Sequence, residues 1–337
     1  MKVMEMRDAW GVDHIKPGIR PDRSPGPGDV LVKMQAASVN YRDLVMTRRG
    51  YGRHSGELPL VPLSDGAGIV AQTGPGVTRV KAGDLVCPTF AQTWISGALR
   101  EEYRPGMLGG PLDGVMQEYM LLPEAGVVKA PAHFSALEAA TLPCAALTAW
   151  SAVIGGGVKP GDAVVTQGTG GVSLFALMFA KLAGATAIIT SASDEKLARA
   201  KALGADIGIN YRTYPEWSRE ARRALGGRGA DLIVELGGAQ SLDQSLRAVR
   251  TSGTLAMIGV LSGGSAELNL GRVVTQNVRL QGVTLGSRAM FEDMVRAIET
   301  HRLKPPIDDK RYAFDQVADA IRSIPAGRHF GKICLAF

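Results

Sequence analysis

A glycine-rich turn between two apolar runs constrains the fold of this chain more than any other feature. Residues 162–173 read DAVVTQGTGGVS, so a predicted strand over 162–167 leads into glycines at 168, 170 and 171. A predicted helix follows over 172–182. Such a turn lets the backbone approach a pyrophosphate, whose charge is stabilised by the free N–H groups at the helix N-terminus. The turn therefore predicts dinucleotide binding, and the alternative is a turn of the same shape with only a structural role.

The segments after this turn alternate between predicted strands and predicted helices. Further strands are expected over 186–190, 207–210, 231–235 and 254–260, and further helices over 194–203, 216–225 and 241–249. This alternation is typical of an α/β fold with a doubly wound parallel sheet, the Rossmann architecture.

The first third of the chain has a different pattern. Short β-branched runs over 29–34, 68–71 and 84–87 lie among Gly and Pro residues and predict a small, mostly antiparallel β-domain. A helix is expected over 135–149, with Ser135 as N-cap and Glu138 three residues later. Helices over 290–300 and 314–324 and a strand over 331–336 are expected to return to the first domain. We therefore predict one domain from residues 1–124 and 286–337, and a dinucleotide-binding domain from residues 125–285.

Composition excludes several classes of protein. The chain has 337 residues, of which 45% are hydrophobic and 21% charged, which is typical of a globular protein rather than a disordered one. No apolar run of about 18 residues and no secretory signal are evident, so neither a membrane span nor secretion is expected. Three widely spaced cysteines are too few for a disulfide framework. We therefore expect a cytoplasmic protein, and its net charge of +6 is too dispersed to favour a nucleic-acid partner.

The end of the second Rossmann strand indicates which dinucleotide binds. An NAD site usually has an acidic residue there to bind the ribose hydroxyls. Residues 190–193 read TSAS, and Lys196 follows. Hydroxyls and an ammonium group suit a 2′-phosphate, so the segment favours NADP(H). NAD(H) remains the alternative if Asp194 turns back towards the ribose.

Several motifs together resemble the medium-chain dehydrogenase/reductase superfamily, on its zinc-free, quinone-oxidoreductase-like side. The matching segments cover nearly the whole chain, at 25–33, 37–43, 62–68, 80–86, 142–150, 168–173, 202–205 and 330–332. The resemblance implies a GroES-like β-domain, formed by both ends of the chain, around a central Rossmann domain.

The resemblance also bears on metal binding. Zinc alcohol dehydrogenases of this superfamily bind a catalytic zinc through Cys, His and Cys, and the matching positions here are Asn40, Ser64 and Cys144. Asp65 follows Ser64 where many relatives have Glu. A single thiol cannot hold a zinc ion that needs three protein ligands. The loop over 90–110, which carries a structural zinc in relatives, has no cysteine, so we expect no metal.

Cofactor contacts are implied by the same resemblance. Asn40 and Thr148 match positions beside the nicotinamide and its ribose, and Lys332 matches a cationic contact near the phosphates. The pyrophosphate turn corresponds to Gly168, Thr169, Gly170, Gly171 and Val172. The 2′-phosphate site corresponds to Ser191, Lys196 and Tyr211. The carboxamide contacts correspond to Ile258, Gly259, Val260 and Leu285.

Without zinc, a simple ketone is a poor hydride acceptor unless hydrogen-bond donors replace the metal, so an acceptor that stabilises its own negative charge suits the site better. A quinone or an α,β-unsaturated carbonyl meets this need, because the enolate or hydroquinone oxygen requires only hydrogen-bond donors and a proton. The catalytic candidates are Asn40, Tyr41, Arg42 and Tyr51, of which Tyr51 matches the proposed proton donor of mitochondrial-type enoyl reductases. Aromatic and methionine side chains within 90–118 suggest an apolar substrate.

Two alternative functions remain open at this point. One is an NAD(P)-dependent alcohol dehydrogenase or carbonyl reductase on the same scaffold, since one fold supports many reactions. The other is a dinucleotide-binding redox sensor or nucleic-acid binder without turnover. Relatives often form dimers by continuing the Rossmann sheet through the strand that matches 278–284, so the resemblance also implies a homodimer.

Overall fold

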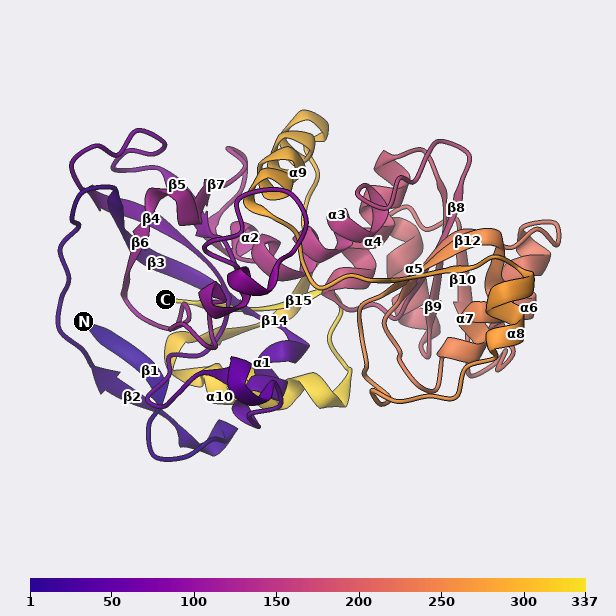
Figure 1. Ribbon diagram of the computed structural model, residues 1–337, viewed down its shortest axis with the longest axis horizontal. Helices are drawn as coiled ribbons and strands as arrows, with labels where there is room; N and C mark the ends of the chain where they lie inside the picture. The colour runs from indigo at the N-terminus through magenta and orange to yellow at the C-terminus, as the bar shows by residue number, and fades with distance from the viewer. The chain divides into compact units, whose positions relative to one another are not determined.

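A parallel sheet of six strands forms the centre of the second unit of the protein, residues 148–285 (Figure 1). The strand order is β10-β9-β8-β11-β12-β13. The strands are β8 (Ala163–Gln167), β9 (Thr186–Ser191), β10 (Ile207–Asn210), β11 (Ala230–Glu235), β12 (Val249–Met257) and β13 (Arg279–Gly282). The order reverses between β8 and β11, and ligands of doubly wound sheets bind at such a switch point. The predicted fold class is confirmed.

The helices of this unit connect the strands as the sequence alternation predicts. They are α3 (Leu147–Val153), α4 (Gly171–Leu182), α5 (Asp194–Ala202), α6 (Trp217–Ala224), α7 (Leu242–Ala248) and α8 (Leu270–Thr275). All six residues of β11 are buried, as expected for a central strand of a parallel sheet. The core includes Val165, Ile188, Ile233 and Leu255 from four neighbouring strands. The short helix α8 was not predicted, and β12 ends at Met257 rather than at residue 260.

The first unit contains a seven-stranded, mostly antiparallel sheet with the order β14-β15-β3-β4-β5-β7, and β6 also pairs with β3. Its strands are β3 (Asp29–Val39), β4 (Asp65–Thr73), β5 (Leu85–Pro88), β6 (Tyr119–Pro123), β7 (Val127–Lys129), β14 (Ile307–Ala313) and β15 (Lys332–Ala336). A separate hairpin consists of β1 (Lys2–Met6) and β2 (Ile15–Ile19). Strand β15 lies between β14 and β3, so the C-terminal segment completes a sheet that begins at residue 29.

The helices of the first unit are α1 (Tyr41–Thr47), α2 (Ala136–Ala139), α9 (Arg288–His301) and α10 (Val317–Ser323). Buried side chains from the sheet and α10 form its core, among them Val32, Val70, Leu335 and Ile321. The N-cap predicted at Ser135 is present, because Ser135 and Glu138 form a reciprocal capping box at the start of α2. The helix predicted over 135–149 is instead α2, a π-helical turn over Leu142–Ala146, and α3.

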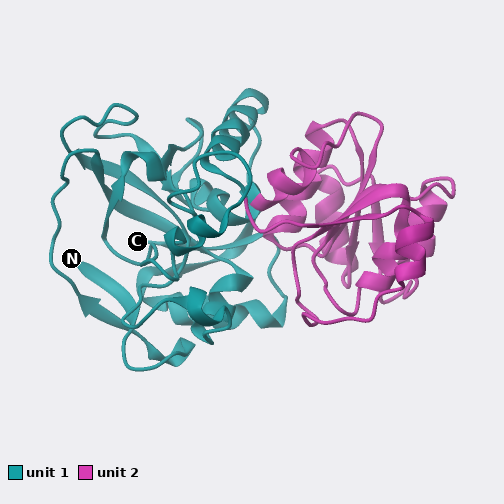
Figure 2. Ribbon diagram, viewed as in Figure 1, with its two compact units in different colours: residues 1–147, 286–337 teal, residues 148–285 magenta.

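The structure is a computed structural model that describes all 337 residues, and it divides into residues 1–147 with 286–337, and residues 148–285 (Figure 2). The sequence-based boundary differs from this division, since it placed residues 125–147 with the dinucleotide-binding domain. The physical reason is strand pairing, because β7 extends the first unit's sheet through β5. The hydroxyl of Ser38 on β3 also donates a hydrogen bond of 2.8 Å to Ala140 O.

One helical run, Ala136–Val153, is long and apolar enough to cross a membrane by length and composition alone. This run was not predicted from the sequence, where no apolar stretch of about 18 residues was evident. The run is 67% buried inside the protein, which is the burial expected of a core helix.

Candidate functional site

The glycine-rich turn at the end of β8 has the geometry of a phosphate-binding turn. Gly168 has a φ of +75°, a conformation that favours glycine, and its N–H donates a 2.8 Å hydrogen bond to Thr190 O on β9. Gly170 is the N-cap of α4 and has no side chain to occupy the free N–H groups of the first helical turn. These groups therefore remain available to an anion.

Ser173 replaces the third glycine of the motif and does more than fill space. It is fully buried in the first turn of α4, and its hydroxyl donates a 2.7 Å hydrogen bond to Gln167 O. The hydroxyl of Thr166 lies 2.7 Å from the hydroxyl oxygen of Ser173. These bonds fix the start of the helix to the end of the strand that precedes the turn.

A buried carboxylate that the sequence analysis missed supports this turn from the neighbouring strand. Glu235 ends β11 and is completely buried. Its carboxylate accepts hydrogen bonds from Gln167 Nε2 (2.8 Å), Gly238 N (2.9 Å) and Ser241 Oγ (2.5 Å), and from Ser245 Oγ. The signal that could have identified it is an acidic residue directly after the apolar run Leu232–Val234, at the end of a predicted strand.

Gln167 connects this carboxylate to the turn. Its amide nitrogen donates to Glu235, and its Oε1 accepts from the N–H groups of Leu236 (3.1 Å) and Gly237 (2.9 Å). Because both ends of the amide are used, its orientation is fixed. Gln167 directly precedes Gly168, so the network holds the phosphate-binding turn against β11.

The residues predicted to bind the 2′-phosphate meet at the ends of β9 and β10. Ser191 ends β9, and its carbonyl accepts a 3.1 Å hydrogen bond from the N–H of Tyr211, which follows β10. Lys196 lies in the first turn of α5, where its N–H is capped by Ser193 Oγ. Asp194 accepts a 2.8 Å hydrogen bond from Asn210 Nδ2 and is directed towards β10 by this contact.

The remaining predicted cofactor residues of the second unit follow β12 and β13. Ile258 and Gly259 donate their N–H groups to Glu235 O at 3.0 and 3.1 Å, while Val260 is exposed. Thr148 Oγ1 donates a 3.4 Å hydrogen bond to the carbonyl of Thr284, next to the buried Leu285. The predicted residues of this unit therefore form contacts at the carboxyl end of its sheet or beside it.

In the first unit, a buried cluster surrounds the ammonium group of Lys332. Its Nζ donates hydrogen bonds to Val39 O at 2.9 Å and to Asn40 Oδ1 at 2.5 Å, and it lies 3.4 Å from Asp65 Oδ2. The side chains of Lys332 and Asp65 are 3% and 0% exposed. Ser64 Oγ donates to Asp65 Oδ1 at 3.1 Å. All three N–H bonds of the ammonium have acceptors here, so none is left for the phosphate contact that the sequence implied.

Arg42 anchors a loop rather than presenting its guanidinium to an open site. Its Nη1 donates to Leu108 O at 3.1 Å, its Nη2 lies 3.4 Å from Gly110 O, and its guanidinium lies 4.4 Å from the centre of the Phe90 ring. The ring centre of Tyr51 lies 6.0 Å from the same guanidinium.

The two tyrosine candidates differ in their surroundings. Tyr41 is the first residue of α1 and is exposed. Tyr51 is exposed to a similar extent, and desolvation of its hydroxyl, partly offset by the charge of Arg42, raises the pKa of that hydroxyl. The hydroxyl is therefore protonated at neutral pH and has a proton to give, while its raised pKa makes it a weaker acid than a free tyrosine.

The residues at the zinc-ligand positions do not fit a zinc ion. Asn40 and Ser64 offer an amide and a hydroxyl, and burial raises the pKa of Cys144 to about 12, so its thiol stays protonated at neutral pH. No group of three or more His, Cys, Asp or Glu side chains is arranged to hold a metal ion. Zinc needs about four ligands that include deprotonated thiolates or imidazoles.

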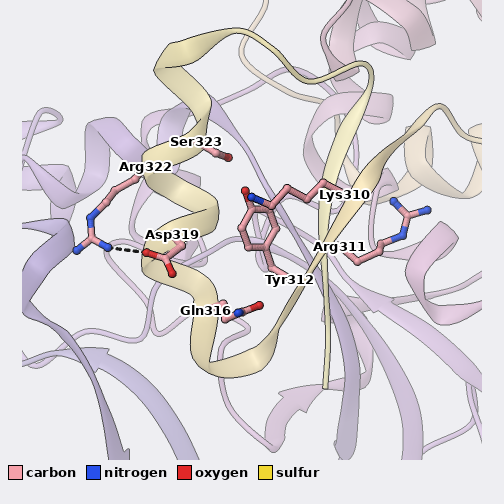
Figure 3. Close-up of a pocket in the computed structure, with 7 residues that line it drawn as sticks. All are labelled: Lys310, Arg311, Tyr312, Gln316, Asp319, Arg322 and Ser323. Carbon is pink, nitrogen blue, oxygen red and sulfur yellow. Dashed lines mark hydrogen bonds and ion pairs between the residues drawn. The ribbon is translucent and has the colours of Figure 1, made fainter.

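A separate surface pocket of about 460 Å³ lies between β14 and α10 in the first unit (Figure 3). It is lined by polar side chains from these two elements, including Arg322, which pairs with Asp319 at 2.8 Å. None of the predicted site residues lines it.

Comparison with known proteins places the chain in a family. The family model for an alcohol dehydrogenase GroES-like domain matches residues 26–132, and that for a zinc-binding dehydrogenase matches residues 171–300. A zinc-type alcohol dehydrogenase-like protein of Schizosaccharomyces pombe is 41% identical over 333 residues, which cover 96% of each chain. A 2-methylene-furan-3-one reductase of Solanum lycopersicum is 30% identical and covers 99% of this chain and 79% of that protein. A solved NAD-dependent alcohol dehydrogenase is 34% identical, covers both chains fully and has a TM-score of 0.89.

The matches extend through both units and agree with the GroES-like sheet, the Rossmann sheet and the phosphate-binding turn described above. The protein therefore belongs to the medium-chain dehydrogenase/reductase superfamily, as an oxidoreductase of the alcohol dehydrogenase type.

Proposed function

We propose that this protein is a zinc-independent, NADP(H)-dependent oxidoreductase that reduces a quinone or an α,β-unsaturated carbonyl. The observation that carries the proposal is the set of residues at the zinc-ligand positions. Asn40 is bonded through Oδ1 to the Lys332 ammonium, Ser64 donates to Asp65, and Cys144 keeps its thiol proton. A simple ketone accepts hydride poorly unless a Lewis acid or several hydrogen-bond donors stabilise the alkoxide that forms. An enone or quinone delocalises the same charge and needs only hydrogen-bond donors.

Each residue group has a defined task in this reaction. The dinucleotide supplies the hydride when it is bound. The turn at 168–172 and the N-terminus of α4 bind and orient its pyrophosphate. Asn40 offers an N–H to an oxygen atom of the bound substrate, and Tyr51 is the proposed source of the proton that completes the reduction. An apolar mouth built from the 90–118 segment would exclude water from the acceptor.

The choice of NADP(H) rests on Ser191, Lys196 and Tyr211. No carboxylate ends β9, and Asp194 is bonded to Asn210, which opposes its turning back to a ribose. One solved relative is NAD-dependent by name, and a comparison of the two cofactors tests the preference. We expect kcat/KM to be at least about tenfold higher with NADPH than with NADH, and Ser191→Asp to reverse the order, because a carboxylate repels a 2′-phosphate and binds a ribose diol. Equal values for the two cofactors in the unmodified protein would contradict this assignment.

The deciding experiment is the reduction of a conjugated enal with NADPH, with the product identified by mass spectrometry. A saturated aldehyde would show that hydride reaches the β-carbon, as proposed. An allylic alcohol would show transfer to the carbonyl carbon and favour the second candidate, an alcohol dehydrogenase or carbonyl reductase. That candidate is supported by the names of the relatives, several of which are alcohol dehydrogenases.

We also propose a homodimer that forms through the edge of the Rossmann sheet. All four residues of β13 are exposed, and β13 pairs with a strand on one side only. Leu270 and Val274 on α8, which precedes β13, are 67% and 76% exposed. Light scattering after gel filtration tests this proposal, and a mass of 35.6 kDa at micromolar concentration would refute it.

A further inference from the structure

The side-chain amide of Asn40 has one end bonded and one end without a partner. Its Oδ1 accepts the 2.5 Å hydrogen bond from Lys332 Nζ, whereas its Nδ2 is buried and has no hydrogen-bond partner within the protein. An ammonium group can only donate, so the amide oxygen must face Lys332. The amide orientation is therefore dictated by chemistry, and the N–H₂ group is directed away from the lysine.

A buried N–H without an acceptor is costly and rare in folded proteins, and it calls for a specific explanation. Other donors near Asn40 are satisfied, since its backbone N–H bonds to Asp43 Oδ2 at 2.7 Å. The orphaned group also lies at a position where zinc-dependent relatives have a metal ligand. An acceptor supplied by a bound ligand accounts for both facts.

Lys332 is itself held firmly in place. Strand β15 pairs antiparallel with β3, with Ile333 opposite Val39, and this register brings Lys332 beside Asn40. Val39 O and Asp65 Oδ2 bind the remaining N–H groups of the ammonium, and both charged side chains are almost completely buried. A cation fixed against the amide oxygen also polarises the amide, which makes its N–H₂ a stronger donor.

We propose that Lys332, neutralised by Asp65, is a positioning residue that orients the Asn40 amide so that Nδ2 donates a hydrogen bond to an oxygen of a bound ligand. We assign that oxygen to the carbonyl group of the substrate, where negative charge develops during hydride transfer. The assignment of the oxygen rests on the function proposed above, whereas the positioning role rests on the contacts alone. A cofactor ribose hydroxyl is the other source of such an oxygen, and the test below separates the two.

The test is a mutant cycle on the full-length protein. Asn40→Ala removes the donor, and Asn40→Asp keeps an acceptor for Lys332 but presents no N–H. Lys332→Met with Asp65→Asn removes the positioning pair without leaving an unpaired buried charge. Lys310→Met, at an exposed lysine on β14, is the matched control. The measurements are kcat and KM for the enal, NADPH affinity by fluorescence titration without substrate, and the thermal unfolding midpoint.

We expect Asn40→Ala and Asn40→Asp each to lower kcat about 100-fold, the effect of losing one donor to a developing oxyanion, with NADPH affinity unchanged. The paired variant at 332 and 65 should lower kcat about tenfold or more. When the paired substitutions are combined with Asn40→Ala, kcat should be no lower than in Asn40→Ala alone, because a positioning residue acts only through the group that it positions. The control should match the unmodified protein.

Three results would overturn the inference or its assignment. Multiplicative losses in the combined variant would show that Lys332 acts on stability or elsewhere rather than through Asn40. An unchanged kcat in the paired variant would remove Lys332 from the mechanism. Weaker NADPH binding by Asn40→Ala with kcat retained would assign the acceptor to the cofactor ribose. If the unmodified protein forms only an allylic alcohol, the function proposed above fails, and the same cycle is then measured on that carbonyl reduction, where non-additivity still decides the role of Lys332.

Discussion

Replacing Glu235 by Gln tests whether the buried network beside the phosphate-binding turn stabilises the Rossmann unit. The substitution preserves shape but exchanges one carboxylate oxygen for an N–H₂ group. In the protein, Oε2 accepts from Gln167 Nε2 and Ser245 Oγ, while Oε1 accepts from Gly238 N and Ser241 Oγ. A serine can rotate its hydroxyl to accept a hydrogen bond, whereas the Gln167 amide and the Gly238 N–H cannot change roles.

Either orientation of the new amide therefore sets two buried donors against each other. An unsatisfied buried donor costs about 1–3 kcal/mol, and the surviving bonds lose the strength that comes from a charged acceptor. We expect Glu235→Gln to lower the free energy of unfolding by about 2–4 kcal/mol. Because Gln167 directly precedes Gly168, we also expect weaker NADPH binding.

Urea unfolding followed by circular dichroism measures the stability change, and fluorescence titration measures NADPH affinity. Asp243→Asn on α7 is a suitable control, since Asp243 and Arg247 form an exposed ion pair whose loss should cost less than about 1 kcal/mol. A Glu235→Gln protein with a stability within about 0.5 kcal/mol of the unmodified one would refute the reasoning.

Three further predictions concern the turn, the proton donor and the pH dependence of stability. Gly168→Ala should cost about 1 kcal/mol and weaken NADPH binding, because a Cβ strains a φ of +75°, whereas Gly264→Ala, where φ is not positive, should change neither urea unfolding nor affinity. Tyr51→Phe should lower kcat about 100-fold in stopped-flow assays with little change in NADPH affinity, and unchanged turnover would remove Tyr51 from the mechanism. Burial acts to raise the pKa of Asp231, but hydrogen bonds, chiefly from Arg250, hold it below the ordinary value of 3.8. The contribution of the Asp231 carboxylate to the free energy of unfolding is therefore complete above about pH 4 and is lost as the pH falls through the lowered pKa. The difference in stability between the unmodified protein and Asp231→Asn should shrink only below about pH 4. A stability difference that is independent of pH would contradict the assignment.

Local patterns predicted most of the Rossmann unit because its strands are short, apolar and separated by turn residues. The capping box at Ser135 was equally predictable, since it depends on residues three apart. Helix α8 escaped prediction because its apolar residues Leu270 and Val274 face solvent instead of following a buried stripe. The boundary at 124 differs from the structure because β7 joins a sheet whose other strands are distant in the sequence.

The site residues also differ in whether their role depends on neighbours in the sequence or on distant residues. The glycines at 168, 170 and 171 form one continuous motif, so their role can be inferred from their order. The bond between Lys332 and Asn40 joins residues 292 positions apart, and only the register between β15 and β3 brings them together. Sequence could place a cation at 332 but could not show that a carboxylate and an amide, rather than a phosphate, take its hydrogen bonds.

The placement of β15 has a consequence for how the protein is made. Strand β3 leaves the ribosome well before β15 is translated, because all of residues 148–285 are synthesised between them. The Rossmann unit is continuous in sequence and can fold during this interval, while the edge of β3 that pairs with β15 is still unpaired. A nascent chain therefore gains its dinucleotide turn early and its Lys332 contact last. Translation that stops short of β15 would yield a polypeptide that carries the glycine-rich turn yet lacks the ammonium beside Asn40.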